Sequence, residues 1–476
     1  MSTQDGYDSF FEDDSCLFGS QTFAPAGTGG DQRKTTSPRE AAEELVKKYF
    51  GHNSLRPTQW EIIYWALKGE DLVVVMPTGY GKSLCYQMPA LIKNVLTVVI
   101  SPLISLMEDQ VAHLKNCGVA AEYVSTNYGS RLVLTERIKR NELRLLYLTP
   151  EMATTSTFME KLKPYIAYIA IDEAHCISQW GHEFRPAYRE LAIIRKNYPG
   201  VPIMALTATV TQQVRQDIGE NLGLKNPKII CGNFDRENLF MEVRPLTYIH
   251  LNLSPLLSDT GNGDKSFGGP AIVYCPTRAR VEEVNRYFSK VGVRSAMYHA
   301  GMTSKQRTEA HRSFSNDVVS VIVATVAFGM GIDKRNVRTV IHYGAPKNIE
   351  SYYQEIGRAG RDGFSARCIA FYCPQDLATK RRLIVENENR IEEHYVKHLE
   401  EIHQSMEKFL TTSGCRRRHP PVPRRGCRLL SGGSLFYFDT PCRNTVFGHG
   451  HSEVKGSSWS RIGEVGVKFF NGSCHA

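Results

Sequence analysis

The sequence of 476 residues lacks a long hydrophobic run and a secretory signal. Its longest apolar stretch, around residues 96–107, is interrupted by Ser101, Pro102 and Ser105, so it is shorter than the roughly 18 to 20 residues that cross a bilayer. The first residues, MSTQDGYDSFFEDD, are acidic and contain neither the basic nor the apolar region of a signal peptide. We therefore expect an intracellular protein without a membrane partner.

A cysteine framework and a strong charge of one sign are also missing. The 12 cysteines stand singly between Cys16 and Cys474, unlike those of small secreted domains, so we expect reduced thiols. The net charge is only +9, although residues 1–40 have a net charge of −4 and residues 411–476 one of +7. This modest excess is compatible with a polyanionic partner but does not require one.

Short apolar, β-branched runs alternate with amphipathic stretches from about Glu40 onward, which is typical of parallel sheets covered on both faces. A Gly-rich break at residues 258–269 separates two such series. The expected strands lie within residues 71–77, 96–102, 143–150, 168–173, 201–209, 271–276, 294–301, 319–325, 338–344 and 366–372. The pattern predicts an α/β chain with two tandem domains. Their expected limits, with the flanking segments, are a disordered acidic arm (1–40), a first domain (41–245), a second domain (246–375), a helical segment (376–412) and a basic disordered tail (413–476).

The stretch MPTGYGKSLCYQ, residues 76–87, follows the first expected strand and opens a helix, as a phosphate-binding loop does. Gly79 and Gly81 let successive N–H groups face phosphates, Lys82 reaches the terminal ones, and the Ser83 hydroxyl can hold Mg²⁺. Met76 stands where the general motif has its first glycine, so a chance Gly-x-Gly-Lys-Ser match is the alternative.

The stretch IDEAHCISQWGHEFRPAYRE, residues 171–190, offers two carboxylates at the end of a strand of the same domain. Asp172 would hold Mg²⁺ and Glu173 would orient and polarise the attacking water of a phosphate-loop enzyme. A zinc site is the alternative, but the Cys-x-x-Cys or His-x-x-x-His spacing of a closed tetrahedral site is missing here.

These motifs, with several others in the same order, resemble those of the RecQ family of ATP-dependent DNA helicases in superfamily 2, and look closest to its Werner-type members. The resemblance covers residues 42–411, and implies two tandem RecA-like domains. The other stretches that carry it are FGHNSLRPTQ (50–59), SPLISLMEDQ (101–110), ALTATV (205–210), FDRENL (234–239), AFGMGIDK (327–334) and SYYQEIGRAGRDG (351–363).

The resemblance implies which residues bind ATP. Arg56 and Gln59 would read the adenine edge, and His52 stands where many family members have a tyrosine that stacks on adenine. The phosphates would lie against the loop residues Thr78, Gly79, Tyr80, Gly81, Lys82 and Ser83. Arg358 and Arg361, three apart on a predicted helix and therefore on one face, would reach the γ-phosphate from the second domain. Gln354 would lie one turn earlier.

The resemblance also assigns the aromatic stretch after Glu173 to the binding of single-stranded DNA. Its expected contacts are Gln179, Trp180, His182, Phe184 and Arg185, and Tyr188 is a further aromatic of this stretch. Base stacking on aromatic rings is worth roughly 1 to 3 kcal/mol per base and is independent of sequence, which suits a motor. Family membership implies 3′ to 5′ travel, duplex junctions as substrates, work in DNA repair, recombination and replication, and residence in the nucleus.

The C-terminal region departs from the family pattern. GCRRRHPPVPRRGCRLL begins at Cys415 like the zinc subdomain of RecQ proteins, but Cys427, Cys442 and Cys474 follow at spacings of 12, 15 and 32 residues, without a close pair. We therefore expect residues 376–412 to be a helical remnant of that subdomain. We expect no structural zinc in residues 413–476. Without the zinc unit, a chain that translocates with ATP but unwinds poorly is an alternative to a full helicase.

A weaker motif lies near the start of the chain. QDGYDSFF places Gln4, Tyr7, Phe10 and Phe11 at the spacing of a sliding-clamp peptide, although Tyr7 replaces the usual aliphatic residue. Incidental aromatics in an acidic arm are the alternative to clamp binding. For the whole chain, the alternatives to a DNA helicase are an RNA helicase, because the DEAH sequence is shared, and a truncated, non-catalytic DNA-binding protein.

Overall fold

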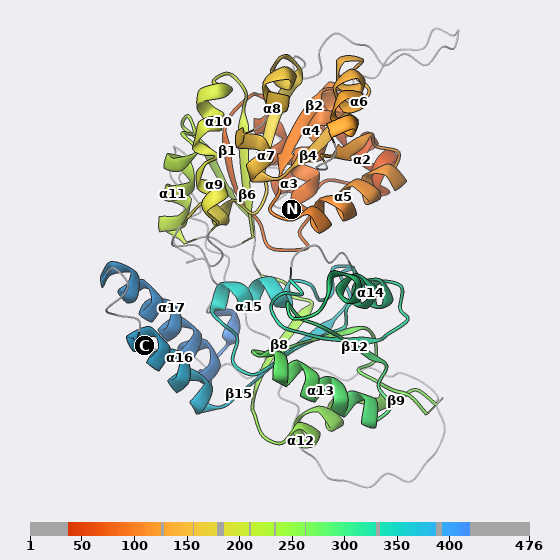
Figure 1. Ribbon diagram of the computed structural model, residues 1–476, viewed down its shortest axis with the longest axis vertical. Coiled ribbons are helices and arrows are strands. Elements are labelled where there is room, and N and C mark those ends of the chain that lie inside the picture. The colour runs from red at the N-terminus through yellow and green to blue at the C-terminus, as the bar shows by residue number, and fades with distance from the viewer. Residues whose placement is uncertain are drawn as a thin grey trace, which may run out of the picture. The chain divides into compact units, whose positions relative to one another are not determined.

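The computed structural model describes residues 37–124, 128–155, 157–178, 185–208, 211–232, 235–261, 263–329, 334–386 and 393–418. Two α/β lobes are built from them, each around one parallel sheet (Figure 1). The first lobe comprises residues 38–231 and the second comprises residues 239–418. Within the described ranges, no helix is both long and apolar enough for a bilayer crossing.

The sheet of the first lobe has the strand order β3-β4-β2-β5-β6-β1-β7, and all of its pairs are parallel. Its strands are β1 (Leu72–Val75), β2 (Leu96–Ile100), β3 (Ala121–Tyr123), β4 (Leu145–Leu148), β5 (Ile166–Ile171), β6 (Ile203–Thr207) and β7 (Lys228–Cys231). Alternate residues of β1 belong to two different core clusters. Val73 and Val75 belong to one cluster, and Leu72 and Val74 belong to the other. Both faces of the sheet are therefore covered by apolar side chains, which explains the continuous apolar runs.

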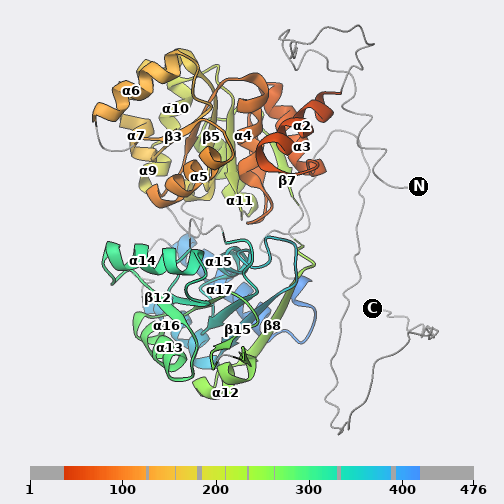
Figure 2. The same cartoon turned by 90° about the vertical axis from the view of Figure 1, so that its right-hand side faces the viewer.

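The helices of the first lobe start at recognisable signals. Ser37 and Glu40 form a reciprocal capping box, and Pro38 occupies the first turn of the first helix. Helices α2 and α3 both pack against α4 (Figure 2). The helices are α2 (Pro38–Phe50), α3 (Pro57–Leu67), α4 (Lys82–Lys93), α5 (Ile104–Asn116), α6 (Tyr128–Lys139), α7 (Pro150–Thr155), α8 (Thr157–Leu162), α9 (Pro186–Arg189), α10 (Ala192–Asn197) and α11 (Gln212–Asn221), with short 3-10 turns η2 (Lys163–Tyr165) and η3 (Ala174–Ile177).

The sheet of the second lobe has the order β12-β13-β11-β14-β15-β8, again with parallel pairs. Its strands are β8 (Leu239–Pro245), β11 (Ala271–Tyr274), β12 (Ser295–Tyr298), β13 (Val321–Ala324), β14 (Thr339–Tyr343) and β15 (Ala366–Tyr372); β9 (Ser258–Asp259) and β10 (Lys265–Ser266) form a separate antiparallel pair. β8 ends at Pro245, inside the range expected for the first domain, yet it pairs with β15. The second sheet therefore begins earlier in the chain than that limit.

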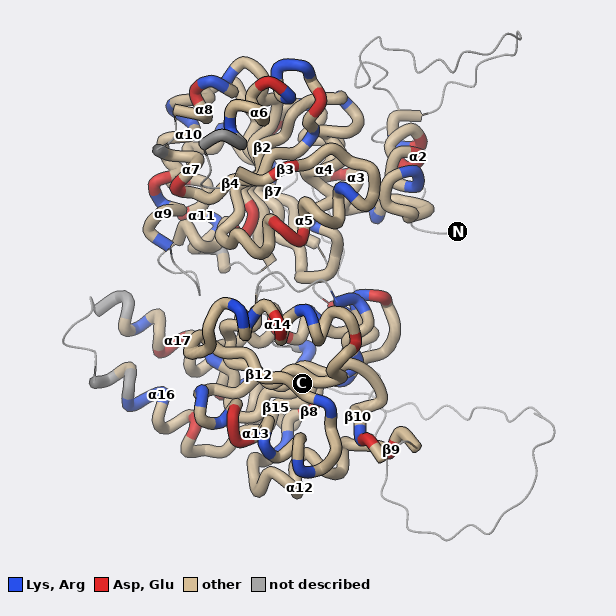
Figure 3. The backbone as a smooth tube through the Cα atoms, turned by 45° about the vertical axis from the view of Figure 1, so that its right-hand side comes forward, with Lys and Arg blue, Asp and Glu red and all other residues tan. Residues whose placement is uncertain are grey.

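The helices of the second lobe are α12 (Ile249–Leu253), α13 (Arg278–Lys290), α14 (Ser304–Ser315), α15 (Ile349–Ile356), α16 (Pro374–Glu386) and α17 (Glu393–Thr411), with 3-10 turns η4 (Ser254–Leu256) and η6 (Arg416–Arg418). α16 and α17 lie side by side (Figure 1), and Phe409 of α17 is buried with its ring centroid 4.8 Å from that of Tyr352. Basic and acidic positions are mixed along α13 and α14 (Figure 3). These two helices therefore do not form a stripe of one charge sign.

The predicted fold class is confirmed: two parallel-sheet α/β domains with a helical extension. Each expected strand is present, while β3, β7, β8 and the short strands β9 and β10 were not predicted. The acidic arm up to residue 36, including the clamp-like motif, lies outside the described residues, as do residues 419–476 of the tail. The limits of the domains and the zinc prediction for the tail stay predictions.

Candidate active site

The phosphate-binding loop connects β1 to α4 and depends on left-handed glycines. Gly79 has φ +79° and Gly81 has φ +83°, and Gly81 is the N-cap that precedes α4. A Cβ atom at Gly79 would lie 3.0 Å from Cγ of Arg361 and 3.3 Å from the carbonyl oxygen of Gly357. Only glycine therefore allows both the loop conformation and this close approach. The N-terminus of α4, where backbone N–H groups lack helical partners, is suited to an anion.

Asp172 and Glu173 directly follow β5, beside the end of β2. The Asp172 amide donates to the Ile100 carbonyl at 2.9 Å, and the Glu173 amide donates to Oδ1 of Asp172 at 3.0 Å. Glu173 has φ +49°, so the backbone turns sharply between the two carboxylates. The Tyr188 hydroxyl donates to the Asp172 carbonyl at 2.9 Å.

Burial and then the neighbouring Glu173 carboxylate raise the pKa of Asp172 to about 6, although Lys82 acts in the opposite direction. Lys82 Nζ lies 4.0 Å from Oε1 of Glu173. A buried carboxyl with a raised pKa gains from a cation at its side, because the cation favours the charged form. Oxygen ligands, here Asp172 with the Ser83 hydroxyl, fit Mg²⁺ held largely by substrate phosphates and water.

His175 connects Glu173 to the neighbouring strand. It is buried, its Nδ1 lies 3.0 Å from Oγ1 of Thr207 at the end of β6, and the same atom lies 3.3 Å from Oε2 of Glu173. The imidazole therefore lies against the second carboxylate, without a hydrogen bond to its Oε2. Among the described residues no group of three or more His, Cys, Asp or Glu side chains is placed to hold a metal ion, so the carboxylate pair has no zinc-type ligand set there.

Arg56 and Gln59 contact the phosphate loop directly. Arg56 Nη1 donates to the Tyr80 carbonyl at 2.9 Å, and its guanidinium lies 4.1 Å from the Tyr80 ring centroid. Gln59 Nε2 donates to the carbonyls of Tyr80 and Gly81 at 3.2 and 3.3 Å. His52 lines one cavity with Arg56 and Gln59. Burial, and after it the charges of nearby arginines, lowers the pKa of His52. Two residues predicted to read adenine thus also hold the loop in shape.

The arginine pair follows α15 rather than lying on a helix. α15 ends at Ile356 with Gly357 as its C-cap, and Gly360 has φ +55°, so the prediction that Arg358 and Arg361 share a helical face is wrong. Gly357 still has right-handed helical angles, with φ −61° and ψ −9°, whereas Gly360 adopts the left-handed conformation that lets the chain turn. Arg358 is buried, with 4% of its surface exposed, and Gln354 of α15 is buried as well.

Arg236 and Asn238 hold the turn that bears the arginines, and sequence reasoning assigned them no role. Arg236 donates to the carbonyls of Gly357, Ala359 and Gly360 at 3.1, 2.9 and 2.6 Å. Asn238 Nδ2 donates to the carbonyls of Gly360 and Phe364, both at 2.9 Å. Both residues belong to the FDRENL stretch, whose clustered polar side chains before a strand were the available signal.

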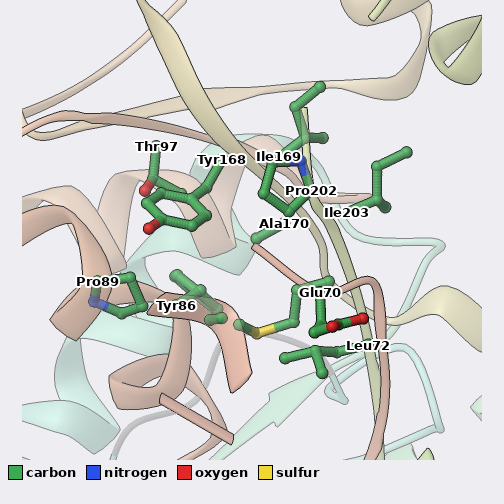
Figure 4. A pocket seen from close by; sticks show the side chains of 12 residues that line it. Glu70, Leu72, Tyr86, Pro89, Thr97, Tyr168, Ile169, Ala170, Pro202 and Ile203 are labelled. Atoms are coloured by element: carbon green, nitrogen blue, oxygen red, sulfur yellow. The ribbon is translucent and has the colours of Figure 1, made fainter. Parts of the chain in front are cut away.

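One cavity of about 550 Å³ gathers these groups. Every residue predicted to act in catalysis, ATP binding or Mg²⁺ binding lines it: His52, Arg56, Gln59, Thr78, Gly79, Tyr80, Gly81, Lys82, Ser83, Asp172, Glu173, Gln354, Arg358 and Arg361. Asn53, Asp109, Gln110, His113 and Arg335 also line it and were not predicted. A separate cavity of about 10 Å³, among Tyr86, Pro89, Thr97 and Tyr168 (Figure 4), has room for about one water molecule.

The residues expected to contact DNA are mostly outside the described ranges. Gln179, Trp180, His182 and Phe184 lie outside them. Arg185 is described, and its Nη1 donates to the Pro102 carbonyl at 3.0 Å, while its amide donates to the Cys176 carbonyl at 2.9 Å. Tyr188, which we expected to be more than a core residue, is fully buried with its hydroxyl on Asp172.

Two family models match the chain: the DEAD/DEAH box helicase model over residues 56–218, and the helicase conserved C-terminal domain model over residues 252–363. A solved structure, the DUF1998 helicase MrfA bound to DNA and AMPPNP, superposes with a TM-score of 0.55 at 19% identity, covering 73% of this chain and 52% of that one. At this identity the likeness supports the fold alone.

Curated relatives are considerably more similar. The ATP-dependent helicase wrn-1 of Caenorhabditis elegans is 46% identical over 389 residues, which cover 80% of this chain and 36% of that protein. The ATP-dependent DNA helicase RecQ of Haemophilus influenzae is 42% identical, with 82% and 64% covered. The putative ATP-dependent RNA helicase R290 of Acanthamoeba polyphaga mimivirus is 41% identical, with 79% and 68% covered. The chain thus spans about a third of the length of wrn-1 and about two thirds of the other two. With these motifs, this fold and these relatives, the chain belongs to the RecQ family of superfamily 2 helicases.

Proposed function

We propose that this chain is an ATP-dependent DNA helicase that moves 3′ to 5′ along a strand. The observation that carries the proposal is the single cavity lined by the phosphate loop, the carboxylates Asp172 and Glu173, and the arginines Arg358 and Arg361. A phosphate cradle, an acid pair and arginines are the parts that phosphoryl transfer to water needs. The names of wrn-1 and RecQ support the same activity.

In the proposed reaction, the loop amides and Lys82 bind the β- and γ-phosphates. Mg²⁺, when bound, would be held by Ser83 and Asp172 and would neutralise charge on the phosphate oxygens. Glu173, which lies beside His175, accepts a proton from water as the water oxygen attacks the γ-phosphorus. The bond between that phosphorus and the β–γ bridging oxygen breaks, which leaves ADP and inorganic phosphate.

The arginines stabilise the charge that spreads over the transferring phosphoryl group. Arginines in such a position contribute about 10³ to 10⁵ in rate in comparable NTPases. Arg358 is suited to this task because it is almost completely buried, and burial strengthens its field at the cavity. Arg56, Gln59 and His52 would contact the adenine. The side-chain amide of Gln59 would then bind the nucleotide as well as the loop carbonyls.

Movement on DNA depends on the segment after Glu173. In the proposed cycle, bases stack on Trp180 and Phe184, and Gln179, His182 and Arg185 contact the strand. Tyr188 connects this segment to the acid pair, because its buried hydroxyl donates a hydrogen bond to the Asp172 carbonyl. Opening one base-pair step costs on average about 1.4 kcal/mol, which ATP hydrolysis can cover.

The test is ATP turnover by the purified chain with single-stranded DNA, with single-stranded RNA and with neither, beside a Lys82→Ala control. We expect stimulation by DNA and a loss of turnover of at least about 100-fold in the variant, because the loop loses its phosphate-binding cation. Stimulation by RNA alone would favour the second candidate, an RNA helicase, which the name of R290 supports. Duplexes with a 3′ or a 5′ single-stranded tail test the direction of travel.

Cellular roles are proposed on the family resemblance. We propose nuclear residence and work at single-stranded DNA and duplex junctions in repair, recombination and replication.

Clamp binding through Gln4, Tyr7, Phe10 and Phe11 rests on the motif alone. Calorimetry with a peptide of residues 1–20 and a sliding clamp would measure heat if the proposal holds and none if it does not.

Metal analysis of the purified chain tests the expectation that the chain binds no zinc. One zinc per chain would contradict that expectation.

A further inference from the structure

We propose that Arg417, in the turn after α17, is a positioning residue for the catalytic arginines. It would act through residues 235–239, the segment that enters β8, which we call the DREN segment. The inference rests on the proposed ATPase function. It adds a contribution from near the end of the described chain, a residue that lies about 240 positions after the acid pair in the sequence.

The first link is the grip of Arg417 on the DREN segment. One guanidinium nitrogen donates to the carboxylate of Asp235 and to the Arg236 carbonyl, the latter at 3.0 Å. The other donates to the Leu239 carbonyl at 2.6 Å and approaches the Glu237 carbonyl at 3.4 Å. A forked cation is needed to span these acceptors, because the single nitrogen of a lysine is a point charge without the fixed fork.

The second link runs from the DREN segment to the turn of residues 357–361. The side chain of Arg236 is directed to the carbonyls of Gly357, Ala359 and Gly360, and that of Asn238 to Gly360. These carbonyls belong to the turn beyond α15, whose own last C=O groups accept from backbone N–H groups of residues 357–359. The two side chains donate to the carbonyls of the turn and so set its path.

The third link is the closeness of that turn to the phosphate loop. A Cβ atom at Gly79 would be 3.3 Å from Nη1 of Arg236, and one at Gly357 would be 3.0 Å from Cβ of Thr78. The turn and the loop therefore have almost no free space between them. A misplacement of about 1 Å can cost about 10²-fold in rate. If the DREN segment moved, Arg358 and Arg361 would be displaced and the rate would fall.

A matched control lies one residue away. Arg416 carries the same charge and stands in the same turn, but its Nη2 donates to the Thr412 carbonyl at 3.1 Å, at the end of α17. Arg417→Ala and Arg416→Ala each remove one positive charge from the same turn. Only Arg417→Ala also removes the hydrogen bonds to the DREN segment. Arg417→Lys keeps the charge and removes the fork.

The experiment uses the full chain and two readouts. Steady-state ATP hydrolysis with saturating single-stranded DNA should show kcat lowered about tenfold or more in Arg417→Ala and at least threefold in Arg417→Lys. KM for ATP should change less than threefold, and Arg416→Ala should stay within twofold of wild type. Hydrogen exchange should be faster in peptides covering residues 235–239 and 350–364 of the Arg417 variants.

The exchange readout does not depend on catalysis, so it separates this inference from the proposed function. If the wild type does not hydrolyse ATP, the function fails while the exchange result still tests the grip. The inference is overturned if residues 350–364 exchange alike in wild type and both Arg417 variants, or if kcat falls equally in the Arg416 and Arg417 variants. Should Arg417→Ala not fold, Asp235→Asn, which weakens the same grip, gives the same two tests.

Discussion

Replacing Asp172 with asparagine should make the metal-free protein more stable while abolishing its activity. Asparagine has nearly the shape of aspartate, and its Oδ1 can still accept from the Glu173 amide. It cannot ionise, so the cost of burying a carboxylate disappears. Burial, together with the Glu173 carboxylate and against Lys82, raises the pKa of Asp172 from the ordinary value of 3.8 to about 6, a difference of about two pKa steps, each worth about 1.36 kcal/mol. The full effect is therefore about 3 kcal/mol.

The sign depends on pH. Below about pH 4 the carboxyl is protonated in the folded and the unfolded chain, and its burial carries no ionisation cost. As the pH rises from about 4 to about 6, the unfolded chain releases the proton that the folded chain retains, so the free energy of unfolding falls. It stays lowered above pH 6. The variant should therefore exceed wild type by about 3 kcal/mol at pH 7.5 and by about half as much at pH 5.

The assay is urea unfolding in EDTA at both pH values, with Asp259→Asn as the control. Asp259 is exposed, and its Oδ1 accepts from the Gly261 amide, a bond that asparagine preserves. With m near 3 kcal/mol/M, the midpoint of the first-lobe transition should rise by about 1 M at pH 7.5. ATP turnover with Mg²⁺ should fall at least about 100-fold. Equal midpoints for wild type and variant at both pH values would refute the reasoning that burial raises the pKa.

Three further changes have clear expected results. Gly81→Ala should lower the unfolding midpoint and raise KM for ATP, because φ +83° costs an alanine roughly 1 to 2 kcal/mol and the added Cβ would collide with the Gln59 amide; an unchanged KM would argue against this fit. Tyr188→Phe should cost about 1 to 3 kcal/mol in urea unfolding, since the buried Asp172 carbonyl loses its donor, and a cost near zero would contradict that contact. Chelation of Mg²⁺ should stop ATP turnover and added Mg²⁺ restore it, whereas zinc alone should not; turnover that persists in EDTA would count against Ser83 and Asp172 as metal ligands.

The strands that sequence reasoning found and those it missed differ in burial. β1, β2 and β4 are buried at every position, and such continuous apolar runs are visible in the sequence. β3, β7 and β8 lie at sheet edges, and many of their residues are half-buried or exposed. An edge strand pairs on one side only and meets solvent on the other, so its composition resembles that of a loop.

The end of α15 shows a second limit. Arg358 and Arg361 were recognised by their motif, yet they were placed on a helix that stops at Ile356. The glycine between them was visible, but the path of the chain after the helix depends on donors for the carbonyls of the turn. Those donors come from Arg236 and Asn238, about 120 residues earlier in the chain. Propensity alone could not reveal them.

The sequence by itself determined the alternation of strands and helices, the family, and the chemistry of the phosphate loop and acid pair. These are local properties, since apolar periodicity, left-handed glycines and motif spacing act over a few residues. Tertiary structure alone decided that the loop at Gly79 meets the turn at Gly357 and Arg361, that Tyr188 is a core residue bound to Asp172, and that Arg417 grips the DREN segment. Such contacts join residues far apart in the chain, and their geometry follows from how whole elements pack rather than from any neighbouring residues.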